Sequence, residues 1–228
     1  MKACAIIAAA GSGQRMQGID KIMLKLGGRE VVSYSLLAFD AAKCVDKIVV
    51  VTSKQNLSSI KSLAQKLNLN TEITVVEGST SRQKSVICGL KECGECDCIM
   101  IHDAARPMIT ANAIDNLYNE VMINKKGAAA LGVAVKDTVK VVNELGVIVN
   151  TPKRETLFAV QTPQAFEIEL YKSAAEKAIE DKAEYTDDCQ LVEALGASVY
   201  MVNGDYKNIK ITTPEDIITA ENFLKERK

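Results

Sequence analysis

The chain has 228 residues, of which 47% are hydrophobic and 25% charged, and its formal net charge is −1 at pH 7. This length suffices for one sizeable α/β core and hardly for two domains. A net charge so close to zero gives no general attraction to nucleic acid or to an anionic membrane, so we expect neither as a partner. Any phosphate chemistry must then rest on a local group of cations.

The opening segment, MKACAIIAAA, has only a weak likeness to a signal peptide, because its short apolar run leads directly into a glycine turn. No apolar stretch approaches the ~18 residues that a membrane span needs. We therefore expect a cytoplasmic protein.

Strands and helices alternate along the first 135 residues. Near-continuous apolar strands that alternate with amphipathic helices are typical of a parallel sheet covered on both faces. With no repeat or linker in the sequence, residues 1–228 are expected to form a single domain. The predicted strands are Ala3–Ala9, Lys47–Thr52, Glu72–Val76, Cys98–His102 and Ala128–Val135, and the predicted helices are Glu30–Ala42, Leu57–Leu67, Ser81–Cys93 and Thr110–Lys125.

The pattern changes after Val135. Residues 136–166 alternate with period two around the turn-like NELG at 143–146, which predicts a β-hairpin too long and too exposed to belong to the main sheet. Its apolar positions must be buried, either in an edge meander on its own domain or, as we favour, in a dimerisation arm at 136–160 that makes the protein a homodimer. Beyond it we expect helices at Glu167–Asp181, Asp187–Leu195 and from Thr213, and a strand at Ser198–Val202.

Four of the seven cysteines fall between residues 88 and 98, and Cys93, Cys96 and Cys98 lie in the sequence CGECDC. A Cys-x-x-Cys pair can bind zinc or take part in redox chemistry. The same residues can be free thiols in a reducing compartment. The second interpretation is favoured, because there is no second Cys-x-x-Cys pair and only one histidine, His102.

The first strand runs into a loop that reads GSGQRMQGIDK, from Gly11 to Lys21. A dinucleotide-binding fingerprint needs a third glycine where Met16 stands, and no Walker loop matches. The loop can still offer backbone N–H groups to anionic oxygens, and Arg15 and Lys21 supply cations suited to a triphosphate. A surface turn with solvated charges is the alternative.

Three more motifs follow predicted strands, where ligands bind in α/β sheets. Asp103 and Arg106 lie in HDAARP, and a strand-end aspartate is a natural Mg²⁺ ligand, while arginine offers a planar fork to phosphate. Ser85 in GSTSRQKSV can reach a base or ribose, and Lys210 in NIKITTPED lies on the same rim. Each motif alone can be ordinary loop polarity, so their weight comes from sharing one edge of a sheet.

Together these motifs resemble one family, the 2-C-methyl-D-erythritol 4-phosphate cytidylyltransferases. AAGSGQRM, EGSTSRQKSV, HDAARP, KDTVK, TPKR, QTPQAF, YTDD and NIKITTPED stand in the family's order from about Ile6 to Leu224. The resemblance implies a Rossmann-like nucleotidyltransferase fold of the glycosyltransferase-A-like type, with a protruding β-arm. It also implies an enzyme of isoprenoid precursor synthesis that transfers CMP from CTP to 2-C-methyl-D-erythritol 4-phosphate, releasing pyrophosphate, with Mg²⁺ or another divalent cation.

The resemblance further implies a role for particular residues. Arg15 and Lys21 would stabilise the charge at the α-phosphate, and Arg154 and Lys210 would aim the attacking phosphate. Asp103 would lie by the metal. The residues implied for CTP are Ala9, Ala10, Gly11, Ser12, Gly13, Gly78, Ser85, Asp103 and Ala104. Those implied for the sugar phosphate are Arg106, Thr138, Arg154, Thr162, Thr186 and Lys210, with Thr138 and Arg154 acting in the partner subunit's site.

Three other functions compete with this interpretation. Ribitol-5-phosphate cytidylyltransferases are similar but tend to carry Ser-Val where this chain has Ala104-Ala105. A catalytically silent nucleotide-binding paralogue is opposed by the joint presence of Arg15, Lys21, Asp103 and Lys210. An NAD-dependent dehydrogenase is opposed by the missing third glycine.

Overall fold

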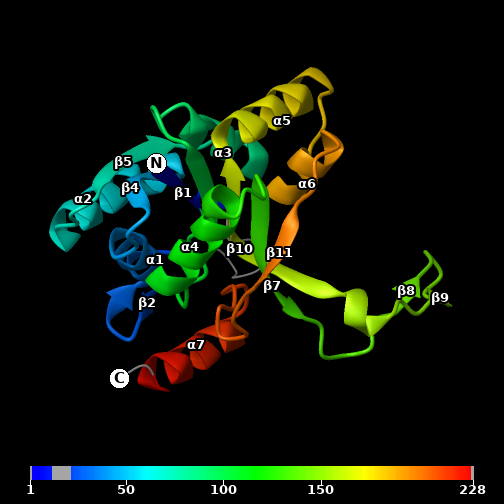
Figure 1. Cartoon of the computed structure of the whole chain (residues 1–228). Helices are drawn as coiled ribbons and strands as arrows, with labels where there is room; N and C mark the ends of the chain where they lie inside the picture. Colours follow the sequence, from blue (N-terminus) through cyan, green and yellow to red (C-terminus); the bar gives the residue numbers. More distant parts are fainter. Residues whose placement is uncertain (1, 12–21, 227–228) are drawn as a thin grey trace.

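The computed structural model describes residues 2–11 and 22–226. At its centre is a seven-stranded sheet with the strand order β11-β7-β10-β6-β1-β4-β5 (Figure 1). Every strand of this sheet runs parallel to the others except β10, which is antiparallel to both of its neighbours. The strands are β1 (Ala3–Ala9), β4 (Val45–Thr52), β5 (Glu72–Glu77), β6 (Cys98–Asp103), β7 (Ala128–Ala134), β10 (Phe158–Glu167) and β11 (Tyr200–Asn203).

Helices cover both faces of the sheet. On β1, successive residues alternate between two buried clusters, with Ile7 in one and Ile6 in the other. The first cluster packs under α1 (Val31–Asp40), α2 (Leu57–Leu67) and α4 (Ala111–Tyr118), which a π-helical turn, η3 (Asn119–Ile123), extends. The second packs under α3 (Arg82–Leu90), α5 (Ile168–Glu180) and α6 (Asp188–Ala194). This double burial is why the parallel strands are apolar throughout.

A smaller cluster joins the last helix, α7 (Pro214–Glu226), to the body. Leu26, Met108 and Ile211 are buried there with Ala220 of α7. The chain around Leu26 forms a short antiparallel pair, β2 (Lys25–Leu26) and β3 (Arg29–Glu30), which the sequence pattern did not predict.

The predicted parallel strands and their helices are confirmed, with ends that differ by a few residues. The N-cap expected at Ser81 is also confirmed, since its side chain accepts a hydrogen bond from the Lys84 backbone N–H (3.3 Å). The placement of residues 158–166 outside the main sheet was wrong. They form most of β10, which pairs with β6 on one side and β7 on the other.

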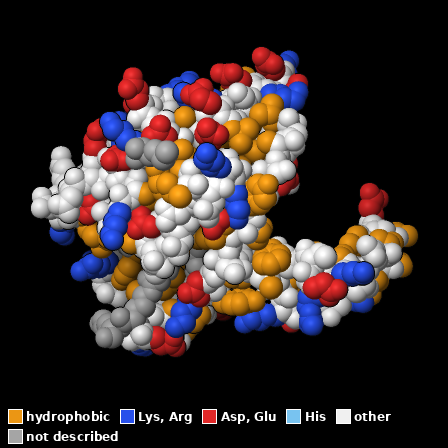
Figure 2. All heavy atoms as spheres, in the orientation of Figure 1, with side chains coloured by type: hydrophobic (Ala, Val, Ile, Leu, Met, Phe, Trp, Pro, Cys, Tyr) orange, Lys and Arg blue, Asp and Glu red, His pale blue; other side chains and the backbone are white. Residues whose placement is uncertain are grey.

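Residues between β7 and β10 leave the sheet. There β8 (Val141–Val142) pairs antiparallel with β9 (Ile148–Asn150), and the Asn143 carbonyl accepts a hydrogen bond from the Gly146 N–H (3.0 Å). The short helix η4 (Arg154–Thr156) leads back to β10. Figure 1 shows this segment standing away from the body, and Figure 2 shows hydrophobic side chains on its surface.

Within the described residues, no helix is both long enough and apolar enough to span a membrane.

Candidate active site

A cavity of about 420 Å³ opens at the carboxyl ends of β1 and β6. The loops that follow parallel strands all begin at the same edge of the sheet, so segments distant in sequence meet there. The end of β1, the loop before α3, the end of β6 and Lys210 all contribute to its wall. The lining residues are Ala8, Ala9, Ala10, Gly11, Ile22, Ser79, Thr80, Ser81, Arg82, Ser85, Asp103, Ala105 and Lys210.

Gly78 and Ser85 shape the loop that forms one side of this cavity. A Cβ atom on Gly78 would lie 2.8 Å from both Ala10 Cβ and Ser85 Oγ, so only glycine lets the loop approach β1 this closely. The buried Ser85 hydroxyl accepts a hydrogen bond from the Ser79 N–H (2.9 Å) and donates to the Ser81 carbonyl (2.7 Å). These contacts hold the turn that brings Arg82 to the cavity.

Asp103 is the electrostatic centre of the site. Its Oδ2 atom lies 2.7 Å from Lys210 Nζ and its Oδ1 atom 3.3 Å from Arg82 Nε, while Arg106 Nε is 4.0 Å away. Burial alone raises the pKa of this carboxyl, but the three cations outweigh it and hold the pKa well below its ordinary value. Asp103 is therefore an anion at neutral pH, surrounded by an excess of positive charge.

A second cavity, of about 220 Å³, shares Arg82, Asp103 and Lys210 with the first. It contains four of the residues predicted for a sugar phosphate: Arg106, Thr162, Thr186 and Lys210. Arg106 donates from Nη1 to the Asn208 carbonyl (2.8 Å), while its buried Nε has no hydrogen-bond partner. A buried donor left without an acceptor is costly, which suits an arginine that awaits an anionic ligand. The other lining residues are Val160, Gln161, Gln164 and Asp187.

His102 and Thr162 hold the turn that carries Asp103. The Thr162 hydroxyl accepts a hydrogen bond from the Asp103 N–H (3.0 Å) and donates to His102 Nδ1 (3.1 Å). His102 Nε2 then carries the proton and donates to the Arg106 carbonyl (3.2 Å). Burial lowers the pKa of His102 to about 4, so the ring is neutral. Thr162 thus borders the second cavity while its hydroxyl supports Asp103.

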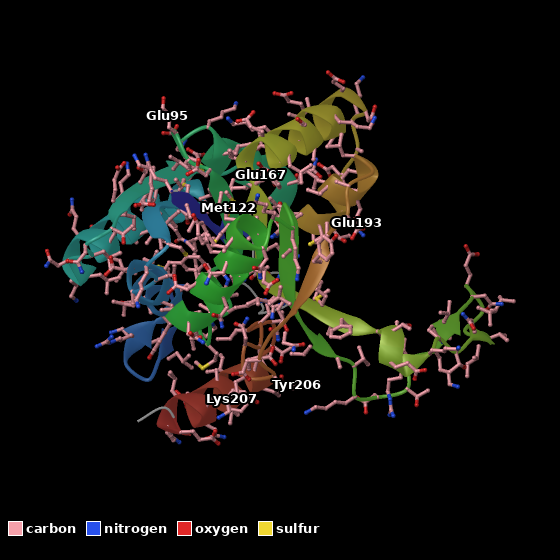
Figure 3. The ribbon with its side chains drawn as sticks, viewed as in Figure 1. Glu95, Met122, Glu167, Glu193, Tyr206 and Lys207 are labelled. Atoms are coloured by element: carbon pink, nitrogen blue, oxygen red, sulfur yellow. The ribbon has the colours of Figure 1, made fainter. Side chains whose placement is uncertain are left out.

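Lys210 comes from the segment between β11 and α7, which is tied to the end of β7. The Tyr206 hydroxyl donates to the Ala134 carbonyl (2.7 Å), and Lys136 Nζ lies 3.8 Å from the centre of the Tyr206 ring. Figure 3 labels Tyr206 and Lys207 beside α7. Gln161 of β10 adds a hydrogen bond to the Asp205 carbonyl (2.8 Å). The antiparallel strand β10 therefore helps to place Lys210.

Other predicted residues lie elsewhere. Ala104 is fully buried, and its N–H donates to the Ala8 carbonyl (3.1 Å). Thr138 and Arg154 are exposed and line neither cavity, and Arg154 Nη1 donates to the Lys136 carbonyl (3.2 Å). Ser12, Gly13, Arg15 and Lys21 lie outside the described residues.

Sequence reasoning missed Arg82 and the polar groups behind it. Arg82 borders both cavities, and its Nη1 atom lies 2.6 Å from Oδ2 of the fully buried Asp188. The available signals were its place at the start of a capped helix after a strand, and the paired aspartates in YTDD. A pairing between positions 82 and 188 is a tertiary contact, so neither signal alone predicted it.

A carboxylate in the wall of a cation-rich cavity fits Mg²⁺, which commonly binds through one or two carboxylates together with substrate phosphates. Asp103 supplies such oxygens in the wall of both cavities. Among the described residues, no group of three or more His, Cys, Asp or Glu side chains is arranged to hold a metal ion by itself. All seven cysteines, which lie within the described ranges, are free thiols.

A helix-covered α/β sheet with a cation-rich cavity at its strand ends fits a nucleotidyltransferase. The family model of 2-C-methyl-D-erythritol 4-phosphate cytidylyltransferase matches residues 3–226. The chain therefore belongs to the 2-C-methyl-D-erythritol 4-phosphate cytidylyltransferase family.

Individual relatives agree with this assignment. The 2-C-methyl-D-erythritol 4-phosphate cytidylyltransferase of Clostridium botulinum (strain ATCC 19397 / Type A) is 42% identical over 223 residues, covering 97% of this chain and 96% of the relative. The enzyme of the same name from Caldanaerobacter subterraneus subsp. tengcongensis is 42% identical, covering 99% and 100%. A crystal structure of the 4-diphosphocytidyl-2C-methyl-D-erythritol synthase of Anaerococcus prevotii superposes with a TM-score of 0.88 at 34% identity, covering 98% and 96%.

Proposed function

We propose that this chain transfers CMP from CTP to 2-C-methyl-D-erythritol 4-phosphate, forming the CDP-linked sugar alcohol and pyrophosphate. Membership of the family supports the reaction. The observation that carries the proposal at the site is the shared wall of the two cavities, where Arg82, Asp103 and Lys210 border both. Two phosphate-bearing substrates can meet across such a wall.

CTP occupies the larger cavity in this proposal. The backbone from Ala9 to Gly11 and the loop around Gly78 line the space for the nucleotide. The loop that continues from Gly11 carries Ser12, Gly13, Arg15 and Lys21, and its two cations neutralise the charge that develops at the α-phosphate.

The sugar phosphate occupies the smaller cavity. Arg106 and Lys210 bind its phosphate there, and Thr186 borders the same space. The attacking phosphate oxygen is already anionic at neutral pH, so no general base is required. Bringing two anions together is the main barrier, and preorganised cations that position and neutralise them lower it. Lys210 aims the attacking oxygen at the α-phosphate of CTP from the wall between the two cavities.

Asp103 would hold Mg²⁺ or another divalent cation. When bound, such an ion supplies charge neutralisation and orientation at the triphosphate. The protein's own part is to keep Asp103 ionised at the edge of the cavity, which Arg82 and Lys210 do.

The protein is a homodimer in this proposal. The arm, expected at 136–160, ends at residue 157, because Phe158 begins β10 of the main sheet. Val142, Leu145 and Ile148 are exposed on the arm, and apolar side chains on a two-stranded ribbon need a partner surface. Thr138 and Arg154 would then reach the partner subunit's site. The remaining residues form a single domain. A cytoplasmic location is supported by the seven free cysteines, because disulfides rarely form in that compartment.

The test is product formation by the purified protein with CTP, Mg²⁺ and 2-C-methyl-D-erythritol 4-phosphate, followed as pyrophosphate release and by mass of the product. Lys21→Ala and Lys210→Ala should each lower kcat by about 10²-fold, the scale of one lost preorganised charge contact. Lys66→Ala, at an exposed position on α2, is the control and should keep full activity.

Activity with ribitol 5-phosphate and none with the erythritol phosphate would refute the substrate assignment. A change in kcat of less than about fivefold for Lys21→Ala or Lys210→Ala would refute the role given to that lysine.

A further inference from the structure

Arg82 is the first residue of α3, and its guanidinium lies between two carboxylates. Nε donates to Asp103 Oδ1 (3.3 Å), and Nη1 donates to Asp188 Oδ2 (2.6 Å). One carboxylate lies at the site, and the other is the first residue of α6 and has no exposed surface. Arg82 therefore links the site to a fixed point in the core.

Asp188 is held on both carboxylate oxygens. Oδ1 accepts a hydrogen bond from the Tyr171 hydroxyl (2.7 Å), and Oδ2 accepts one from Arg82 Nη1. The Asp188 N–H donates to Gln164 Oε1 (3.1 Å). A buried carboxylate with this set of donors cannot swing away without leaving a charge unpaired, which is costly. Asp188 is thus a rigid anchor for the guanidinium.

Asp103 depends on that anchor for its orientation. Lys210 contacts Oδ2 of Asp103 and Arg82 contacts Oδ1. Because each oxygen has its own cation, the carboxylate cannot rotate freely about its Cβ–Cγ bond. Arg106 Nε lies 4.0 Å from Oδ2 and makes no hydrogen bond, so it does not share in holding the carboxylate. If Arg82 were removed, Oδ1 would lose its donor and the Asp103–Lys210 pair would be free to turn.

We propose that Arg82, anchored by Asp188, is a positioning residue for the transfer reaction: it holds Asp103, and through it Lys210, in the orientation that the two substrates require. This inference rests on the proposed function. The step concerned is the one in which the attacking phosphate is aimed. Neither Arg82 nor Asp188 was predicted from the sequence as a residue of the site. A flexible lysine in place of Arg82 keeps the charge but cannot fork between two carboxylates.

The test is steady-state kinetics of Arg82→Gln, Arg82→Lys and Asp188→Asn. A loss of alignment of about 1 Å costs about 10²-fold, so kcat of Arg82→Gln should fall on that scale, while KM for CTP changes less than about threefold. Arg82→Lys should recover part of kcat. Because Asp188 acts through Arg82, the double variant Arg82→Gln/Asp188→Asn should be no slower than Arg82→Gln, so the two effects do not multiply.

The matched control is on the same helix. Lys84 pairs with Glu184 (3.0 Å) and, like Arg82, connects α3 to the segment around α6, but both side chains of this pair are largely exposed. Lys84→Gln should leave kcat unchanged. Tyr171→Phe provides a milder loosening of the anchor, which keeps the test valid if Asp188→Asn folds poorly, and it should lower kcat with KM for CTP unchanged.

Three results would overturn the proposal: a kcat for Arg82→Gln within about threefold of the unaltered protein, effects that multiply in the double variant, or an equal loss in Lys84→Gln. Product formation by the unaltered protein separates this proposal from the assigned activity, and calorimetry with α,β-methylene-CTP measures nucleotide binding apart from the reaction. If the unaltered protein binds the analogue and forms product, the function stands whatever Arg82→Gln does. If it forms no product, the proposed function fails, and with it the positioning role.

Discussion

At the scale of single residues, the site depends on a fully buried histidine that lines neither cavity. His102 is the chain's single histidine, and the Phe39 ring lies 5.2 Å from it, while Ser35, Thr162 and the Arg106 carbonyl surround its nitrogens. The ring is therefore enclosed and neutral. In the HDAARP motif the aspartate lines the two cavities, whereas the histidine keeps the turn in place.

The buried histidine predicts a pH dependence of stability. Burial lowers the pKa of His102 to about 4, below the ~6.5 of an exposed histidine in the unfolded chain. Between these two pH values the unfolded state binds a proton that the folded state does not. The stability that the neutral His102 ring contributes is therefore complete above pH ~6.5 and is lost as the pH falls toward 4. The free energy of unfolding should drop by about 3 kcal/mol over this range.

Urea unfolding between pH 4.5 and 7, in metal-free buffer, measures the slope of the free energy of unfolding against pH. His102→Gln is the comparison, since an amide can accept from Thr162 and donate to the Arg106 carbonyl without titrating. The variant should lose the slope above pH 4.5. An equally steep slope in His102→Gln would assign the effect to other groups.

At the scale of elements, the parallel strands were predictable and β10 was not. The parallel strands are apolar on both faces because helices cover both, and that signal is local. In β10, Phe158–Val160 are exposed. The side chains of Gln161, Thr162 and Gln164 are buried, and each makes a hydrogen bond to a segment distant in the sequence. The ladder to β7 is irregular between Val160 and Gln164, where Pro163 cannot donate. A proline and polar residues argue against a central strand unless the tertiary contacts are known.

The arm is the element with the clearest test. Val142 and Ile148 are paired across β8 and β9, and both side chains are more than half exposed (54% and 57%). If they pack against a second copy, replacing both with lysine buries two charges without partners, and the dimer should dissociate. Light scattering after size exclusion should then give half the mass of the unaltered protein.

Ile218→Lys is the control, because Ile218 is exposed on α7, away from the arm (64%). It should keep the dimer mass. A dimer that survives the substitutions at Val142 and Ile148, or an unaltered protein that is monomeric, would contradict the role given to the arm.

At the scale of the whole molecule, a shared site predicts complementation between subunits. If Arg154 acts in the partner's site, Lys210→Ala and Arg154→Ala each impair every site when alone, yet a mixed dimer has one intact site. Random exchange makes half of the dimers mixed, so about a quarter of the sites should regain activity. Kinetics after mixing and re-equilibrating the two variants measures this. No recovery, with mixed dimers confirmed by mass, would place Arg154 outside the partner's site.

The sequence by itself determined the sheet of apolar parallel strands, the loops at their carboxyl ends and the family to which the chain belongs, because these are local patterns in a characteristic order. It also placed Asp103, Arg106 and Lys210 on one rim. Only the tertiary structure decided that β10 lies inside the sheet, between β7 and β6, and that Arg82 lies between Asp103 and Asp188. The Arg82 contacts join residues that are 21 and 106 positions apart, and β10 pairs with β6 and β7 across long stretches of the chain. No local pattern encodes such pairings.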